Sequence, residues 1–243
     1  MRNFEKISPL LSSVRRCVQN YGMISDGDKI AVGVSGGKDS LALLCALSSM
    51  RRFYPHKYDI VAITVDLGLK DTDYSVVARL CGELDVEYSI VKTQIAEVVF
   101  EKRNDGCSLC SRMRRGALHA EAQRLGCNKV ALGHTKDDVA ETLIMNIFYA
   151  GKIEVFWPKN IPDDREMTLI RPLIYTTEKT VRSFCANNGI ELVKNNCPMD
   201  KKTMRESVKQ MIADADKAHK GVLHRIFRSI EKSEIDGFSD FGE

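Results

Sequence analysis

The sequence lacks any hydrophobic run as long as a membrane span. Its first 20 residues contain Arg2, Arg15 and Arg16 but no apolar core of a signal peptide. With 44% hydrophobic and 28% charged residues, the composition is ordinary for a folded domain. We therefore expect a cytoplasmic protein with no membrane association. The 243 residues suffice for one α/β domain, or for one domain and a small appendage.

Aromatic residues and net charge are also low. Aromatic residues amount to 7%, with a single tryptophan, so we expect no aromatic-rich surface for stacking nucleic-acid bases. The formal net charge of +3 excludes a protein that is basic over its whole surface. Two stretches nevertheless carry excess charge: residues 102–129 have seven Lys and Arg against two acidic residues, and residues 194–228 have nine against four. Such stretches are either solvated faces or sites of salt-sensitive contact with a phosphate backbone.

No repeat or low-complexity tract interrupts the chain, and hydrophobic segments of strand and helix type alternate along it. This alternation predicts an α/β fold with a doubly wound parallel sheet and a small helical C-terminal region. In such a sheet, ligands bind at the carboxyl ends of the strands, where Ser35, Asp66 and residues 133–138 are placed. The expected strands are residues 29–34, 58–65, 86–91, 129–132 and 169–170. The expected helices are residues 5–21, 41–50, 74–84, 108–125, 136–150 (buried on most faces), 178–188 and 200–218, with a terminal helix after them, a loop at 158–167 and a frayed tail at 238–243.

One glycine-rich segment joins the first predicted strand to the next helix. It reads Ser35-Gly36-Gly37-Lys38-Asp39-Ser40. Glycines let backbone N–H groups approach an anion closely, and a helix N-terminus adds partial positive charge, so the segment predicts a phosphate-binding turn. Its spacing is not that of a Walker A motif. The plainer alternative is an ordinary turn before a helix.

Eight cysteines are many for a chain without a secretory signal, and they favour metal binding or catalysis over disulfides. Cys107 and Cys110 form a Cys-x₂-Cys pair whose spacing suits zinc, an iron–sulfur cluster or a dithiol. Cys197, followed by a proline, is the third candidate. Three thiolates on a four-iron cluster would leave one iron open to an external sulfur ligand. The other five are expected to be small buried hydrophobic residues: Cys17, Cys45, Cys81, Cys127 and Cys185.

The glycine-rich turn resembles the PP-loop of the N-type ATP pyrophosphatases, which cleave ATP between its α- and β-phosphates and place AMP on the acceptor. Four further segments are similar to the TtcA family, the tRNA 2-thiocytidine synthetases. With the PP-loop, they span about residues 10–220 in the family's order. These segments are Cys-Ser-Leu-Cys-Ser-Arg-Met-Arg-Arg-Gly (107–116), Ala-Leu-Gly-His-Thr-Lys-Asp-Asp (131–138), Asn-Ile-Phe-Tyr-Ala-Gly-Lys (146–152) and Arg-Pro-Leu-Ile-Tyr (171–175).

The resemblance implies a PP-loop ATP-binding domain at residues 1–175 and a helical region at 176–243 that completes the cluster site, or one continuous domain. It implies ATP, Mg²⁺ and a [4Fe-4S] cluster held by Cys107, Cys110 and Cys197. Family members usually have a second Cys-x₂-Cys near the third ligand, whereas this chain has only Cys197 there. The implied nucleotide-binding residues are Gly33, Val34, Ser35, Gly36, Gly37, Lys38, Asp39, Ser40, Val65, Gly133 and Asp138.

The implied reaction is thiolation of a cytidine in the tRNA anticodon loop, forming 2-thiocytidine at position 32. Adenylation turns the poor leaving group on C2 into AMP, which a sulfur nucleophile then displaces. Lys38, Asp137 and Arg114 are the expected catalytic residues, and Asp39 is the candidate ligand of Mg²⁺. A cysteine desulfurase is an expected sulfur donor, and a homodimer is expected because family members are often dimers.

Some of these residues also have structural interpretations. Thr135 and Asp138 match a capping box of the following helix, and Asp137 also lies in its first turn. Arg112, Arg115 and His119 share one helical face. In the functional interpretation this face contacts substrate phosphate or the transferring AMP; in the structural interpretation it is simply exposed to solvent. His134 is expected to be a packed or hydrogen-bonded histidine, outside the catalytic set.

Other functions share parts of this pattern. A related tRNA 2-thiouridine synthetase, or a TtcA-like enzyme with another substrate, would use the same PP-loop and Cys-x₂-Cys pair. An amide- or amidine-forming ligase, of the lysidine synthetase or NAD synthetase type, would need no cysteines. A nucleotide-binding iron–sulfur redox sensor would need no turnover, and its output would survive Lys38→Ala.

Overall fold

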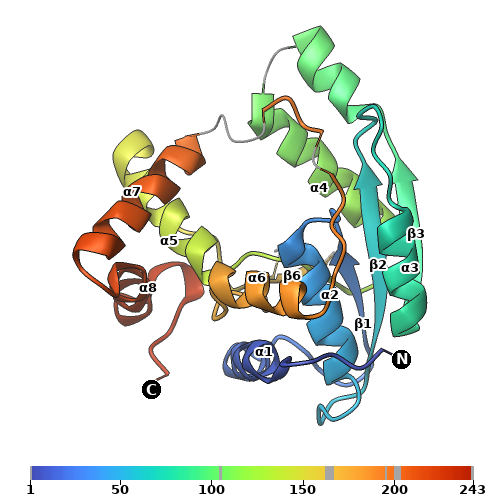
Figure 1. Cartoon of the computed structure of the whole chain (residues 1–243), viewed down its shortest axis with the longest axis horizontal. Helices are drawn as coiled ribbons and strands as arrows, with labels where there is room; N and C mark the ends of the chain where they lie inside the picture. Colours follow the sequence, from blue (N-terminus) through green and yellow to red (C-terminus); the bar gives the residue numbers. More distant parts are fainter. Residues whose placement is uncertain (1, 104–105, 162–166, 195, 200–203, 242–243) are drawn as a thin grey trace.

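A computed structural model describes residues 2–103, 106–161, 167–194, 196–199 and 204–241. The described residues form a six-stranded sheet in the order β3-β2-β1-β4-β6-β5, in which only the β5–β6 pairing is antiparallel. The predicted doubly wound parallel sheet is therefore confirmed (Figure 1). The strands are β1 (Asp28–Gly33), β2 (Tyr58–Asp66), β3 (Glu87–Lys92), β4 (Lys129–Ala131), β5 (Lys159–Asn160) and β6 (Thr168–Ile170).

Alternate residues of the central strands enter two separate hydrophobic cores, because successive side chains of a strand point to opposite faces. Ile30 and Val32 of β1 belong to the larger core, whereas Ala31 between them belongs to the smaller one. The larger core is built with the helices α1 (Ser8–Asn20), α2 (Lys38–Met50), α3 (Ser75–Leu84) and α6 (Glu178–Asn187). The smaller core is covered by α4 (Gly106–Arg124) on the other face.

The C-terminal helices pack beside α5 (Lys136–Met145). They are α7 (Met204–Ala218) and α8 (Val222–Lys232), and Phe227 of α8 is 1% exposed within the larger core. In Figure 1, α5, α7 and α8 lie on the side of the molecule away from β3 and α3. The division of the chain at residues 175 and 176 stays a prediction. Residues 200–203, where a helix was expected to begin, lie outside the described part.

Several local expectations were wrong. Residues 158–167 were expected to be a loop, but Lys159–Asn160 pairs with β6 at the sheet edge. A π-helix, η1 (Glu97–Arg103), precedes α4 without having been predicted. The tail was expected to fray at 238, yet Phe238 is 1% exposed because its ring packs edge-on against Phe227. Residues 242–243 of that tail and 162–166 of the loop are not described.

The helix expected over residues 136–150 ends early. After α5 the chain continues as a π-helix, η2 (Asn146–Ala150), in which Ile147, Phe148 and Tyr149 are 41%, 56% and 53% exposed. The expectation that this helix is buried on most faces is therefore wrong for its last turn. Trp157 is also 48% exposed, so aromatic surface is available in this segment, contrary to the expectation from composition.

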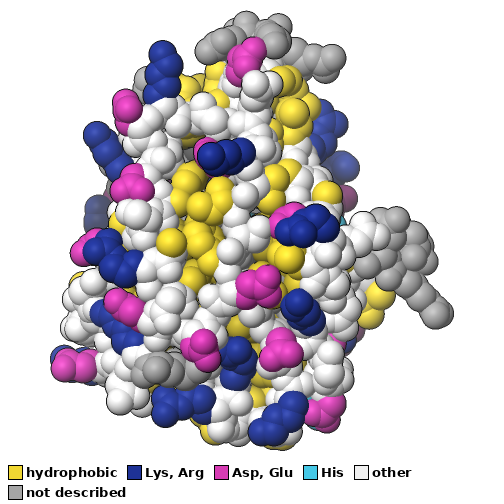
Figure 2. Space-filling view, turned by 90° about the vertical axis from the view of Figure 1, so that its right-hand side faces the viewer, with side chains coloured by type: hydrophobic (Ala, Val, Ile, Leu, Met, Phe, Trp, Pro, Cys, Tyr) yellow, Lys and Arg dark blue, Asp and Glu magenta, His cyan; other side chains and the backbone are white. Residues whose placement is uncertain are grey.

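Figure 2 shows the face over α3 and the edge strand β3. Basic and acidic side chains are intermixed there around a strip of hydrophobic ones, and neither sign gathers on this face. None of the helices in the described part of the chain has the length and hydropathy that a membrane span needs.

Candidate active site

The glycine-rich turn lies between the carboxyl end of β1 and the N-terminus of α2. Ser40 Oγ donates to the Gly37 carbonyl oxygen at 2.9 Å, and the Ser35 backbone N–H donates to Ser40 Oγ at 3.2 Å. These bonds close the turn around the first backbone N–H groups of α2, which have no partner within the helix. The turn therefore presents donors to an anion at a helix N-terminus, as predicted for a phosphate-binding turn.

Gly36 joins this turn to a segment that is distant in the sequence. Its φ is +81°, and a Cβ atom there would lie 2.2 Å from Val193 Cγ2. The Val193 N–H donates to the Gly36 carbonyl oxygen at 3.0 Å. Only glycine fits both the conformation and the close contact. The segment after α6, which leads to Cys197, is thus fixed against the phosphate-binding turn (Figure 1).

A cavity of about 350 Å³ opens at the carboxyl ends of β1, β2 and β4, next to this turn. The expected ligand contacts Val65 and Gly133 line it, from β2 and from the residues just after β4. A volume in this range suits a small-molecule ligand such as a nucleotide. We call it the nucleotide pocket. Its lining also includes Gly33, Val34, Ser35, Gly37, Asp39, Ser40, Ile63, Arg114, Arg115, His119, His134, Phe156 and Arg171.

Lys38 does not line the nucleotide pocket, although the adjacent Asp39 does, and two carboxylates hold its side chain. Its Nζ lies 2.8 Å from Asp39 Oδ2 and 3.1 Å from Glu178 Oε1. Burial lowers the pKa of Lys38, but these carboxylates outweigh burial and the pKa is raised, so the side chain is a full cation. Burial also raises the pKa of Glu178, yet hydrogen bonds from Lys209 and Lys38 bring it to about 2.

Asp39 fits the expected Mg²⁺ site. Its Oδ1 atom is buried and has no hydrogen-bond partner in the described structure, while Oδ2 binds Lys38. Burial raises the pKa of Asp39 despite the lysine beside it. A buried carboxylate oxygen without a partner is costly, and a divalent cation would satisfy it. The orphan oxygen therefore supports Asp39 as a magnesium ligand, a role that stays a prediction.

The carboxylates at the start of α5 have structural partners. Thr135 Oγ1 accepts from the Asp138 N–H at 3.4 Å, and Asp138 Oδ2 accepts from the Thr135 N–H at 2.7 Å, which completes a capping box. Asp137 Oδ2 accepts from the Glu178 N–H at 2.7 Å, and burial raises the pKa of Asp137. The helix-capping interpretation is confirmed for Asp138. It does not conflict with a second role, because both carboxylates line a cavity described below.

Thr135→Ala tests how much this cap contributes. Loss of an N-cap side chain is expected to lower the free energy of unfolding by about 1 kcal/mol. Denaturant unfolding followed by circular dichroism measures it, with Thr142→Ala, two turns further along the chain, as the control. An unchanged midpoint for Thr135→Ala would contradict the capping role.

One face of α4 borders the nucleotide pocket. Arg114, Arg115 and His119 line it, together with Ser111 and Leu118, at the three- and four-residue spacing of a helix. Arg112, which was placed on this face from the sequence, is exposed and does not line the pocket. The face of α4 that lines the pocket therefore includes Arg114 in place of the predicted Arg112, while Arg115 and His119 lie on it as predicted.

The three candidate thiols lie together although 87 residues separate Cys110 from Cys197 in the chain. Cys107, Cys110 and Cys197 line one cavity of about 440 Å³, which we call the thiol cavity. Its wall shares Ser35, Gly37, Val65, Ser111 and Arg114 with the nucleotide pocket, so the two spaces adjoin. The other five cysteines are buried, as expected.

The thiol set fits a cluster in the number and kind of its ligands. Within the described residues, however, no three His, Cys, Asp or Glu side chains lie close enough to hold a metal ion. Burial raises the pKa of Cys110, so binding a metal there would release a proton. A cluster would hold each thiolate on a separate iron, farther apart than around a single ion, and the ligand role of these cysteines stays a prediction.

Comparison with known proteins decides the family. The model of the PP-loop domain family matches residues 7–215. A tRNA-cytidine(32) 2-sulfurtransferase of Geobacter sulfurreducens is 38% identical over 224 residues, which are 90% of this chain and 87% of the relative. The chain belongs to the PP-loop family. Within this family it belongs with the TtcA enzymes, and the resemblance seen in the sequence is confirmed.

Another relative and two solved structures are also similar to this chain. A tRNA-cytidine(32) 2-sulfurtransferase of Vibrio cholerae is 36% identical, covering 98% of this chain and 79% of the relative. Among solved structures, the U34-tRNA thiolase NcsA of Methanococcus maripaludis with its [4Fe-4S] cluster has a TM-score of 0.75 at 24% identity, covering 92% of this chain and 78% of that one. An NMN synthetase of Francisella tularensis has a TM-score of 0.50 at 15% identity, covering 91% and 93%. These two structures establish the PP-loop fold alone.

A third cavity, about 320 Å³ in volume, is lined by residues that sequence reasoning missed. Asp137 and Asp138 line it together with Cys107 and Cys197. Glu141 is 5% exposed there, and burial raises its pKa to about 7. The helical spacing from Asp137 to Glu141 was the available sequence signal. We call this space the charged cavity; it is also lined by Lys38, Asp39, Glu178, Arg205 and Lys209.

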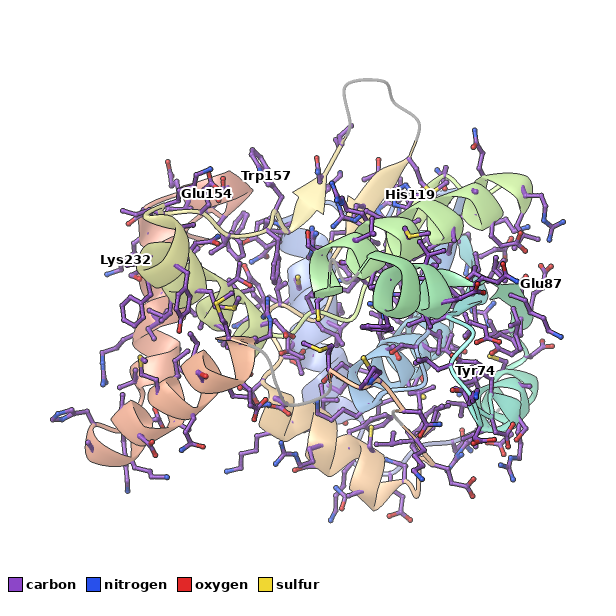
Figure 3. The ribbon with its side chains drawn as sticks, turned by 90° about the horizontal axis from the view of Figure 1, so that it is seen from above. Tyr74, Glu87, His119, Glu154, Trp157 and Lys232 are labelled. Atoms are coloured by element: carbon purple, nitrogen blue, oxygen red, sulfur yellow. The ribbon has the colours of Figure 1, made fainter. Side chains whose placement is uncertain are left out.

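Ion pairs connect the elements around the charged cavity. Arg205 of α7 donates to Glu141 Oε2 at 3.2 Å, and Lys209 lies 2.7 Å from Glu178 Oε2. Helix α7 is thereby tied both to α5 and to the carboxylate that holds Lys38. Figure 3 shows the molecule from above. His119 and Tyr74 lie on the side that contains α4 and the sheet, whereas Glu154 and Trp157 lie on the side that contains α5, α7 and α8.

Proposed function

We propose that this protein is an ATP-dependent, iron–sulfur-cluster-dependent tRNA sulfurtransferase that forms 2-thiocytidine at tRNA position 32. The observation that carries the proposal is the common wall between the nucleotide pocket and the thiol cavity. An enzyme that first adenylates an oxygen and then replaces it with sulfur needs both groups within reach of one atom. The names of the relatives at 36–38% identity support the choice of substrate.

The proposed reaction has two steps. The C2 oxygen of cytidine attacks the α-phosphorus of ATP, and pyrophosphate leaves. A sulfide-level sulfur then attacks C2, and the original oxygen departs with AMP. The bound cluster would hold that sulfur, and Mg²⁺ would neutralise phosphate charge.

The residues of this chain have distinct proposed roles in these steps. The turn from Ser35 to Ser40 binds the phosphates through backbone N–H groups and hydroxyls, and Lys38 neutralises the leaving pyrophosphate. Asp39 and Asp138 lie on the phosphate side, while Val65 and Gly133 approach the adenosine. Arg114 stands in the wall shared with the thiol cavity, where it would contact the transferring AMP.

Asp137 is the proposed catalytic carboxylate. It lines the charged cavity together with Cys107 and Cys197, so an acceptor base bound there would face the carboxylate and the thiols at once. Because burial raises the pKa of Asp137, its carboxylate accepts a proton more readily than an exposed aspartate.

Deletion of the gene tests the substrate. Mass spectrometry of nucleosides from the tRNA of a deletion strain is expected to show no 2-thiocytidine, and expression of the chain restores it. Anaerobically purified protein is expected to contain iron and sulfide. Loss of a 2-thiouridine instead would assign the related uridine activity, and unchanged thionucleosides would reject the proposal. An active protein free of iron and sulfide would favour a ligase.

The remaining partners are proposals that follow from this function. A cysteine desulfurase supplies the sulfur as a persulfide, and a thiol reductant provides the two electrons that bring it to the sulfide level. The protein works in the cytoplasm, where tRNA and reduced thiols occur, and it forms a homodimer. Light scattering of the purified protein measures the oligomeric state, and the rate of thiolation with and without a desulfurase measures its need for the donor.

A further inference from the structure

His134 lies directly beside the phosphate-binding turn. The preceding residue, Gly133, approaches α2 so closely that a Cβ atom would lie 3.0 Å from Asp39 C and Ser40 N. Such contact with backbone leaves no room for a side chain, so the chain passes the start of α2 at van der Waals distance. His134 therefore reaches the nucleotide pocket at its phosphate end, and it is one of the lining residues.

Two neighbours fix the imidazole ring of His134. Arg171 Nε donates to His134 Nδ1 at 3.2 Å, and the Phe156 ring lies against the imidazole with centroids 4.7 Å apart. The Arg171 guanidinium also stacks on Phe156, 4.8 Å from the ring centroid. The backbone N–H of Arg171 donates to the Pro158 carbonyl oxygen at 3.0 Å. Arginine, histidine and phenylalanine thus form one packed unit at the wall of the pocket.

This arrangement decides which nitrogen of His134 carries the proton. Arginine can only donate, so Nδ1 must be the unprotonated, accepting nitrogen. Burial lowers the pKa of His134 to about 4, and the positive charge of Arg171 acts in the same direction, so the ring is neutral at pH 7. The single proton then resides on Nε2. In the described part of the structure, no hydrogen bond involves Nε2.

We propose that His134 is a nucleotide-binding residue that donates its Nε2–H to an oxygen of the ATP phosphate chain, and that Arg171 is a positioning residue that holds His134 in this tautomer. The inference rests on the proposed use of ATP in the nucleotide pocket. A neutral donor can bind an oxygen of the phosphate chain without adding a further cation to a pocket that Arg114, Arg115 and Arg171 already line. It also assigns a role to a histidine that the sequence placed outside the site.

Long-range ¹⁵N–¹H correlation spectra of the nucleotide-free protein test the tautomer directly. The chain has five histidines, and the His134 signals are assigned by their loss in His134→Phe. Nδ1 is expected in the range of an unprotonated nitrogen and Nε2 in that of a protonated one, without change from pH 8 to pH 5. Arg171→Met is expected to give a mixture of tautomers, and Arg171→Lys, which keeps one donor, restores the single form. A proton on Nδ1 in the wild type would overturn the proposal.

Titration calorimetry with Mg²⁺ and ATP tests the contact itself. His134→Phe keeps an aromatic ring on Phe156 but removes the donor, and it is expected to weaken ATP binding about 10-fold, which corresponds to about 1.4 kcal/mol. The control His56→Phe changes an exposed histidine paired with Asp26 and is expected to bind like wild type. Wild-type affinity in His134→Phe would overturn the inference and leave the proposed thiolation intact. Failure of the wild type to bind ATP would instead reject both.

Discussion

Replacement of Cys197 by alanine is expected to abolish 2-thiocytidine formation and leave the affinity for ATP unchanged. Cys107 and Cys110 come from one helix, and Cys197 is the only one of the three thiols that the segment after α6 supplies. Two thiolates leave a four-iron cluster without its third protein ligand. Iron and sulfide content should fall to background, and thiolation should drop by at least about 100-fold, more than is typical for residues that support a ligand.

The selectivity of that loss comes from geometry. Cys197 lines the thiol cavity and the charged cavity but not the nucleotide pocket. The Cys197→Ala substitution therefore removes no contact to the nucleotide, and the ATP affinity measured by calorimetry should stay within about 2-fold of wild type. The matched control is Cys127→Ala, which removes a buried thiol from the core beneath α4. It should lose some stability and retain iron. Cluster content and thiolation at wild-type levels in Cys197→Ala would contradict the proposed ligand set.

The sequence was sufficient to predict the sheet and the phosphate-binding turn, because both are encoded locally. Alternating hydrophobic segments specify strands and helices, and Gly36, whose φ is +81°, allows a turn that other residues would strain. The meeting of Cys197 with Cys107 and Cys110 was expected from family resemblance. In the structure, the position of Cys197 depends on tertiary contacts such as that between Val193 and Gly36, which no local sequence pattern predicts.

What the sequence did not reveal depends on tertiary packing. Arg171 and His134 are 37 residues apart and meet only because β6 lies beside β4. Glu178 and Lys209 lie within predicted helices and were assigned no role. In the structure, Glu178 of α6 pairs with Lys38, and Lys209 of α7 pairs with Glu178. The exposed turn of η2 was missed for the same reason, since hydrophobicity alone does not say whether another element covers a helix.

Lys38→Met is expected to lower the rate of AMP formation by about 100- to 1000-fold, the range typical of removing one group that stabilises developing charge. Methionine keeps much of the apolar stem and removes the cation. Asp39 then loses the cation that lies 2.8 Å from it, and Glu178 loses the one at 3.1 Å while keeping Lys209, so the negative charge of these carboxylates is less compensated. Repulsion between these carboxylates and ATP adds to the lost attraction, and ATP affinity should fall as well. Single-turnover AMP formation with saturating tRNA and Mg²⁺ measures the effect on the chemical step.

Lys209→Met is the matched control for this variant, because Lys209 also pairs with Glu178, at 2.7 Å, and its hydrogen bond also lowers the pKa of that carboxyl. If the effect of Lys38→Met came merely from unbalancing Glu178, both variants would slow AMP formation alike. If Lys38 acts on the phosphates, Lys209→Met should lose far less activity, because it leaves the Lys38 cation in place. Equal losses in the two variants would therefore reject a direct role for Lys38 and move the argument to Glu178, whose hydrogen bonds join α6 and α7 to the phosphate-binding turn.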